Sequence, residues 1–202
     1  MSAGLSLRGV SFLDWKPVSI EVGEGECVGI SGASGSGKSL LLRAIADLDV
    51  NEGDVRLGDV GREAVEGPVW RSLVGMLPAE PRWWEERVGA HFGREIAETL
   101  ERLERFGFSG DVMEWEVRRL SVGERQRLGL VRMLESNPRA LLLDEPTANL
   151  DEDNTRVAEE MIAAYRDGER APVLWVSHNE AQLSRVSRRV LVMKGKELAA
   201  AE

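Results

Sequence analysis

The apolar residues of this chain fall into short runs separated by segments with helical spacing. Continuous apolar runs occupy residues 140–143 (ALLL), 173–176 (VLWV) and 190–193 (VLVM). Such runs are typical of parallel strands covered on both faces. Further short strands are predicted for LSLRGVSF, PVSIEV and ECVGI near the N-terminus, and for VRLGDV and SLVGML beyond them. Strands that alternate with helices indicate an α/β fold with a mainly parallel sheet.

Three segments are predicted as helices. The first covers residues 38–48 and the second residues 91–106, where charged side chains occupy the face opposite the apolar one. The third begins near Ser121 and stops before Asn137 and Pro138. The apolar positions are Leu41, Leu42, Ile45 and Leu48 in the first helix, and Ile96, Leu100, Leu103 and Phe106 in the second.

Length and composition narrow the class of protein. A chain of 202 residues suits one domain, or one domain with a small insertion. The net charge of -9 argues against nucleic acid as a partner, because neutralising phosphates needs clustered cations. The chain lacks both a signal-peptide pattern and an apolar run of about 18 residues. Its lone cysteine, Cys27, excludes an internal disulfide framework, so we expect a cytosolic protein.

The segment GASGSGKS, residues 32–39, fits the phosphate-binding pattern G-x-x-x-x-G-K-[ST] and lies between a predicted strand and helix. Its glycines let backbone N–H groups face phosphate oxygens, and the helix N-terminus adds positive charge. Lys38 supplies a point charge to the β/γ-phosphates, and the Ser39 hydroxyl can bind Mg²⁺. The alternative is a Gly/Ser turn that only caps a helix. The candidate nucleotide-binding residues are Gly32, Ala33, Ser34, Gly35, Ser36, Gly37, Lys38, Ser39 and Leu40.

Two carboxylates follow the apolar run ALLL, in the sequence LLLDEPT. Ligands of open α/β sheets bind beyond the carboxyl ends of the strands. Asp144 is therefore placed to hold Mg²⁺ and Glu145 to polarise an attacking water, as phosphoryl transfer requires. The alternative is a loop that merely ends a strand. His178 follows the run VLWV, although a lone histidine there is more often a surface residue.

The stretch LSVGERQR, residues 120–127, allows two interpretations. Ser121 and Glu124 fit the S-x-x-E capping box of a helix start. The same stretch also belongs to an ordered set of motifs. The phosphate loop, LSVGE, LLLDEPT, ANLD and a strand that ends in histidine follow one another as in ABC-type ATPases, which the chain resembles over nearly its whole length.

This resemblance implies a P-loop NTPase core with an N-terminal antiparallel β part and a short α-helical arm. Residues 1–202 would form a single ATPase domain. Within it, residues 1–80 and 138–202 would form the core, and residues 81–137 the helical arm and signature helix.

The resemblance also implies ATP and Mg²⁺ as cofactors and a second ATPase subunit, a second copy of this chain, as partner. Two subunits would sandwich two ATP molecules head to tail, with Ser121, Gly123 and Glu124 completing the opposite site. Asn149 to Asp151 of ANLD would communicate between the sites. The implied catalytic residues are Glu145, His178 and Lys38. The implied adenine-stacking residue is Trp15, with Phe12 as the alternative.

One position departs from the family pattern. The family usually has a Mg²⁺-binding glutamine at the end of the strand that leads into the helical arm, whereas this chain has Ala79. Alanine cannot coordinate a metal. Either the adjacent Glu80 substitutes through a shifted backbone, or the metal site lacks one protein ligand. Beyond it, at least one of Trp83 and Trp84 is expected at the interface with a membrane subunit. The alternative is that both pack inside the arm.

The resemblance predicts an ATP-hydrolysing subunit that energises a separate integral membrane permease. Such a protein would be cytoplasmic and peripheral on the inner face of the cell membrane. The stretches LERFGF, LLLDEPTANLDEDN and VLWVSH resemble the small bacterial ATPases paired with a metal (iron) export permease. The alternative is a non-transport ABC-type ATPase that acts as a nucleotide-gated switch on a soluble partner. Three other classes fit the sequence less well. A DNA-repair ATPase would need a longer helical arm, and a ribosome-acting ABC protein would need a second ATPase domain. In a P-loop kinase the stretch LSVGERQR would have no role.

Overall fold

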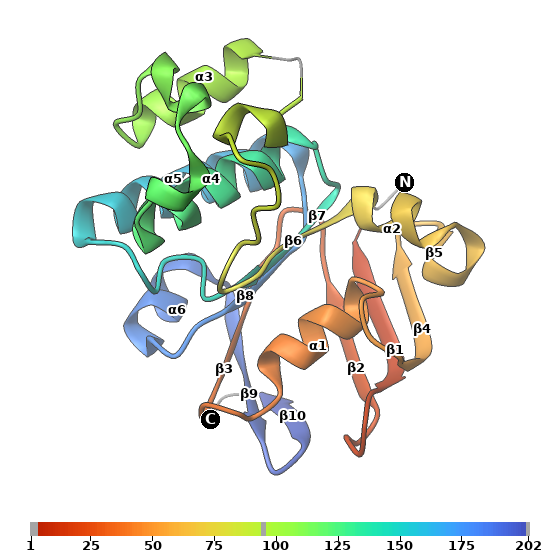
Figure 1. Ribbon diagram of the computed structural model, residues 1–202. Coiled ribbons are helices and arrows are strands. Elements are labelled where there is room, and N and C mark those ends of the chain that lie inside the picture. The colour runs from red at the N-terminus through yellow and green to blue at the C-terminus, as the bar shows by residue number, and fades with distance from the viewer. Residues whose placement is uncertain (1–3, 94–95, 201–202) are drawn as a thin grey trace.

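The computed structural model describes residues 4–93 and 96–200, and its strands form two sheets (Figure 1). The four-stranded sheet has the order β2–β1–β4–β5 with antiparallel pairs. The six-stranded sheet has the order β10–β9–β3–β8–β7–β6 and is parallel apart from the β9–β10 hairpin. The strands are β1 Leu5–Ser11, β2 Val18–Val22, β3 Cys27–Gly32, β4 Glu52–Leu57, β5 Val60–Gly61, β6 Val74–Leu77, β7 Ala140–Asp144, β8 Val173–Val176, β9 Arg189–Lys194 and β10 Glu197–Ala200.

Helices cover both faces of the six-stranded sheet. Helix α1 lies between this sheet and the four-stranded one, whereas α3, α4 and α5 gather on the opposite side (Figure 1). The α-helices are α1 Lys38–Ile45, α2 Gly67–Leu73, α3 Ile96–Arg105, α4 Val122–Glu135, α5 Glu152–Glu169 and α6 Glu180–Val186. Short 3₁₀ helices are η1 Arg62–Ala64, η2 Val88–His91, η3 Gly110–Glu114 and η4 Val117–Arg119.

The central strand β7 shows why the apolar runs predict the sheet. Leu142 points to the core shared with α1 and the four-stranded sheet, whereas Leu141 and Leu143 point to the core beneath α4 and α5. All three side chains are fully buried. A strand covered on both faces has no polar position to alternate with, so its sequence is continuously apolar. The predicted fold class, with a mainly parallel sheet, an antiparallel β part and helices, is confirmed.

Two predicted helices have different bounds in the structure. The first ends at Ile45, not at residue 48, because Asp47 adopts a left-handed φ of 57°, and Leu48 is 45% exposed. The second does not include residues 91–93, because His91 closes the 3₁₀ helix η2 and the Gly93 N–H donates to the Glu135 carboxylate. Its predicted residues 94 and 95 lie outside the described residues, and α3 starts at Ile96.

Local turns changed several strands. The segment VRLGDV is divided by a turn at Gly58, where φ is 60°, into the end of β4 and the start of β5. The segment SLVGML is a strand only from Val74, because residues 67–73 form α2, whose first turn holds a proline. Helices α5 and α6 were not predicted from the apolar pattern. The third predicted helix is confirmed as α4.

The helices of the described residues are shorter or more polar than a membrane span. None of those in residues 4–93 and 96–200 combines the length and apolar character that a transmembrane helix needs.

Candidate nucleotide site

The segment between β3 and α1 has the backbone of a phosphate-binding loop. Gly37 caps α1 with a left-handed φ of 92°. A Cβ atom on Gly37 would lie 2.5 Å from the ring of Trp15, which packs against the loop at this point. Only glycine tolerates both the left-handed φ and the close approach of the Trp15 ring, so the turn itself requires glycine at this position.

Lys38 lies at the start of α1 and is almost completely buried. Its Nζ donates to the carbonyl oxygens of Gly32, at 2.7 Å, and Ala33, at 3.0 Å. An ammonium group has three donors, so one remains for an anion. The nearby Ser36 hydroxyl is buried and has no hydrogen-bond partner among the described residues. An unpaired buried hydroxyl and a partly paired ammonium fit a loop that binds phosphate oxygens.

Asp144 is the last residue of β7 and is 5% exposed. Burial raises the pKa of its carboxyl group, and the neighbouring charge of Glu145 adds to this. Hydrogen bonds from the Ser39 side chain and the Ala79 backbone, with the charge of Lys38, oppose the rise in pKa. The carboxylate of Asp144 and the hydroxyl of Ser39 line the same cavity. These are hard oxygen ligands of the kind Mg²⁺ prefers.

Few protein groups surround this pair. In the part of the chain that the structure describes, no cluster of three or more His, Cys, Asp or Glu side chains is placed to hold a metal ion. Mg²⁺ bound with nucleotide commonly uses one or two protein ligands, with phosphates and water as the others. The donor set of Ser39 and Asp144 fits that mode. Ala79 lies beside this pair, whereas Glu80 is exposed and does not line the cavity.

Glu145 and His178 face each other across the ends of β7 and β8. The Nδ1 atom of His178 lies 3.0 Å from Oε1 and 3.1 Å from Oε2 of Glu145. Glu145 has a left-handed φ of 49°, which turns the chain directly after the strand. A non-glycine residue in this conformation is uncommon and is concentrated at functional sites. The side chain of Glu145 is 19% exposed and that of His178 74%.

These residues share one cavity of about 340 Å³ at the carboxyl end of the parallel sheet. The lining residues are Ser34, Gly35, Ser36, Gly37, Lys38, Ser39, Leu40, Ala79, Asp144, Glu145 and His178. The tertiary structure thus brings together the predicted phosphate loop, the two carboxylates and the histidine. The position Ala79 lies with them, as its place after β6 predicts.

The two aromatic candidates for adenine stacking have different environments. Phe12 is only 4% exposed and belongs to the core. Trp15 is half-buried, stacks on Phe12 with ring centroids 5.5 Å apart, and contacts the phosphate loop at Gly37. Of the two, Trp15 is the ring available beside the loop.

The stretch LSVGE lies at the start of α4 and outside the cavity. Ser121 Oγ accepts from the Glu124 N–H, and the Glu124 carboxylate accepts from the Ser121 N–H at 2.8 Å, which completes the predicted capping box. A Cβ atom on Gly123 would lie 2.9 Å from the carbonyl oxygen of Asn149. Close packing on the ANLD turn therefore requires glycine here, and Asp151 of that turn caps α5.

Gln182 is a buried polar residue near the site that the sequence analysis did not single out. Its side-chain nitrogen donates to Thr147 Oγ1 at 2.8 Å, and its oxygen accepts from Ser177 Oγ at 3.0 Å. It therefore joins the segment after β7 to the segment after β8, which carry Glu145 and His178. In the sequence, the only sign of this role is an amide residue shortly after VLWVSHN.

A strand, a glycine-rich loop, a helix and an acidic strand end around one cavity define the nucleotide site of a P-loop NTPase. Comparison with known proteins narrows the class. The family model described as "ABC transporter" matches residues 15–148. The chain therefore belongs to the ABC transporter family, as one of its ATP-binding subunits, and the predicted ATPase class is confirmed.

Several curated relatives have similar sequences. The "Probable iron export ATP-binding protein FetA" of Escherichia coli is 32% identical over 174 residues, which cover 81% of this chain and 77% of the relative. The "Aliphatic sulfonates import ATP-binding protein SsuB 3" of Paraburkholderia xenovorans is 35% identical over 190 residues, or 90% and 71% of the two chains. "Protein STAR1" of Oryza sativa is 32% identical over 191 residues, which cover 90% of this chain and 55% of the relative. The predicted resemblance to ABC transporter ATP-binding subunits is thus confirmed, and an iron-export ATPase is among these relatives.

A solved structure supports the fold. An ATP-bound bacterial Atm1-family ABC exporter superposes with a TM-score of 0.85 over 98% of this chain and 39% of its own, at 22% identity.

Proposed function

We propose that this protein binds and hydrolyses Mg²⁺-ATP as the energy-supplying subunit of a transporter with a separate membrane permease. The observation that carries the proposal is the single cavity lined by Lys38, Asp144, Glu145 and His178. Each of these side chains supplies one requirement of phosphoryl transfer. The named relatives FetA and SsuB 3 are ATP-binding proteins of an export and an import system, which supports a permease as partner.

In this proposal the phosphates of ATP bind the N–H groups of the loop and the remaining donor of Lys38. Ser39 and Asp144 would hold Mg²⁺, which spreads the charge of the phosphates when it is bound. Glu145 orients a water molecule for attack on the γ-phosphorus. The bond between the γ-phosphorus and the oxygen that bridges it to the β-phosphorus then breaks, and this oxygen leaves with ADP. His178 holds the Glu145 carboxylate by the observed contact and lies within reach of the γ-phosphate.

A second copy of this chain completes the site in the proposal. Ser121, Gly123 and Glu124 lie outside the cavity of their own chain, and the adjacent Val122 is 57% exposed. The capping box occupies the N–H groups of Ser121 and Glu124, so those of Val122 and Gly123, with the partial positive charge of the helix N-terminus, would meet a phosphate on a partner. Asp151, at the cap of α5, would transmit contacts between the two sites. Trp15 would stack on the adenine.

The division of the chain belongs to the same proposal. Residues 1–80 and 138–202 would act as the nucleotide-binding core, and residues 81–137 as the arm that faces the permease. Trp83 and Trp84 of this arm hold the guanidinium of Arg132 between them, 4.3 and 5.1 Å from the ring centroids, and Trp84 is 71% exposed. The protein would work at the cytoplasmic face of the membrane, without nucleic acid.

The test is an ATP-dependent change of oligomeric state. Glu145→Gln removes the group that orients water but leaves every phosphate contact in place. We expect this variant to bind ATP, to lose hydrolysis by about a hundredfold or more, and to elute as a dimer in size-exclusion chromatography with Mg²⁺-ATP.

The control is Glu169→Gln, which makes the same chemical change at an exposed site at the end of α5. It should hydrolyse ATP as the wild type does. A Glu145→Gln protein that stays monomeric with saturating ATP would contradict the sandwich, and one that still hydrolyses ATP would contradict the role of Glu145. Lys38→Ala should weaken ATP binding itself, and an unchanged affinity would contradict the placement of the phosphates.

A further inference from the structure

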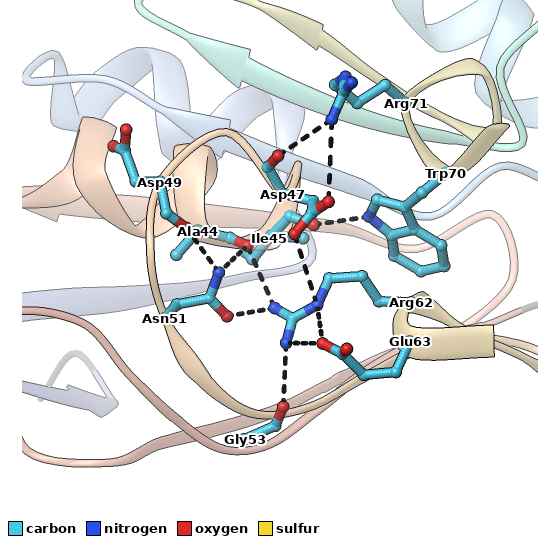
Figure 2. A network of polar contacts seen from close by, with 10 residues as sticks. All are labelled: Ala44, Ile45, Asp47, Asp49, Asn51, Gly53, Arg62, Glu63, Trp70 and Arg71. Atoms are coloured by element: carbon cyan, nitrogen blue, oxygen red, sulfur yellow. Dashed lines mark hydrogen bonds and ion pairs between the residues drawn. The ribbon is translucent and has the colours of Figure 1, made fainter. Parts of the chain in front are cut away.

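The carboxyl end of α1 is held by polar side chains from three later parts of the chain. Figure 2 shows this network around Arg62, which is 5% exposed. Arg62 donates to the side-chain oxygen of Asn51 and to the carbonyl oxygen of Gly53 at 3.2 Å. It also forms an ion pair with Glu63 at 2.8 Å. A buried guanidinium with this many partners is compatible with a folded core.

The network supplies partners for the last carbonyl groups of the helix. The Ala44 carbonyl oxygen accepts from the Asn51 side chain at 3.2 Å and from Arg62 at 3.4 Å. The Ile45 carbonyl oxygen accepts from the Trp70 indole N–H at 2.8 Å, and both groups are buried (Figure 2). The last carbonyls of a helix lack the usual intrahelical donors. The Ala44 carbonyl oxygen also accepts from the Asp47 N–H at 3.2 Å, so the side-chain donors add to that bond, and the Trp70 indole supplies the bond to Ile45.

We call the contacts of Asn51, Arg62 and Trp70 with the end of α1 the clamp. The same helix begins with Lys38 and Ser39. Its eight residues span about 12 Å, so a shift at one end is passed on to the other. The apolar contacts of Leu41, Leu42 and Ile45 with the sheets keep the helix against the core. The attraction behind such contacts is non-directional and favours no particular position along the helix axis by itself, whereas a hydrogen bond has a preferred direction. Bonds to the terminal carbonyls lie roughly along that axis and determine its axial position.

We propose that Arg62 and Trp70 are positioning residues for nucleotide binding, because they set the position of α1 and thereby of Lys38 and Ser39. Trp70 belongs to α2, which continues directly into β6 and the segment with Ala79. The clamp thus ties the phosphate-binding helix to the strand that ends beside Asp144. This inference rests on the proposed function, since it concerns the same nucleotide site.

The structure also predicts which kinetic constant changes. Contacts from α1 are made to the phosphates of bound ATP before reaction as well as during it, so their loss raises KM. The hydrogen bonds and ion pairs of the network go to α1, α2 and residues 47–63, not to β7 or β8, which lead to Glu145 and His178. We therefore expect kcat to change by less than about twofold.

The experiment compares Trp70→Phe and Arg62→Gln with the wild type. Trp70→Phe keeps an aromatic ring in the core and removes the indole N–H that donates to the Ile45 carbonyl oxygen. Titration calorimetry with Mg²⁺-ADP at 10 °C measures affinity, and circular dichroism shows that each variant is folded at that temperature. We expect at least about fivefold weaker binding for both variants, with a matching rise in the KM for ATP. Arg62→Lys, which keeps the charge but loses the fork of donors, should be intermediate.

The control is Arg43→Gln. Arg43 also lies on α1, but its guanidinium points outward to Asp49 and bonds no helix carbonyl. It should bind Mg²⁺-ADP as the wild type does. Folded Trp70→Phe and Arg62→Gln proteins with wild-type affinity and KM would overturn the inference, because the network would then only stabilise the fold. A wild-type protein that fails to bind Mg²⁺-ADP would instead overturn the proposed function.

Discussion

The imidazole of His178 contacts the carboxylate of Glu145, with Nδ1 3.0 Å from Oε1. The two residues are 33 positions apart and follow neighbouring parallel strands, whose register pairs Asp144 with Val176. Because both strands end at the same edge of the sheet, both side chains enter the same cavity. The contact restrains the carboxylate that is proposed to orient the attacking water.

The first prediction concerns this contact. His178→Ala should lower the rate of ATP hydrolysis by about tenfold or more. The imidazole would no longer hold the Glu145 carboxylate in place, and the γ-phosphate would lose a proposed contact. Phosphate release under saturating Mg²⁺-ATP measures the effect. His91→Ala is the matched control, since His91 is the other histidine of the chain and does not line the nucleotide cavity. Full activity of His178→Ala would show that the contact has no role in hydrolysis.

The second prediction concerns Ala79. Ala79→Gln should lower the Mg²⁺ concentration for half-maximal hydrolysis by about threefold or more, because its amide oxygen adds a ligand beside Asp144 and Ser39. Ala79→Met is the control, with a side chain of similar length that lacks the oxygen. Equal Mg²⁺ dependence of the two variants would mean that the added amide does not reach the metal.

The third prediction separates the two roles of Ser121. Aspartate is as good an N-cap as serine, but its charge would face the Glu124 carboxylate that now accepts from Ser121 Oγ at 2.8 Å. Ser121→Asp and Ser121→Ala should therefore each lower the free energy of unfolding in urea by about 1 kcal/mol. The aspartate charge would repel a phosphate on the partner subunit. ATP-dependent dimerisation should therefore fail in Ser121→Asp in the Glu145→Gln background. Normal dimerisation there would restrict Ser121 to capping α4.

The fourth prediction concerns Cys27, which is buried at the start of β3. Burial raises the pKa of its thiol from an ordinary value of 9.0 to about 12. The thiol should therefore stay protonated and resist a disulfide reagent at pH 8 until the protein unfolds. Since the unfolded state loses this proton first, the thiol's contribution to stability is lost as the pH rises from about 9 to about 12.

The measurement uses the single cysteine as its own probe. One equivalent of thiol should react in urea and almost none in the native protein. Fast reaction of the native protein at pH 8 would show that the start of β3 opens readily. In Cys27→Ala, the fall in stability between pH 9 and 12 should be smaller than in the wild type.

The sequence analysis was most accurate where a continuous segment carries its own structure. The runs ALLL and VLWV became buried parallel strands because covering both faces removes every polar position. It was least accurate at ends and turns. Helix α1 stops at Ile45 because the chain turns at Asp47, and its last carbonyls accept from Asn51, Arg62 and Trp70, which follow the carbonyls they bond by 7 to 25 residues.

The sequence alone was sufficient to predict the phosphate loop, the acidic strand end and the capping box, because each of them is formed by residues that are neighbours in the chain. Only the tertiary structure decided which separate segments meet. It buried Phe12 and left Trp15 beside the loop, placed the Ala79 backbone against Asp144, joined His178 to Glu145, and clamped α1 with Arg62. These contacts depend on strand register and on packing between layers, which no local pattern specifies.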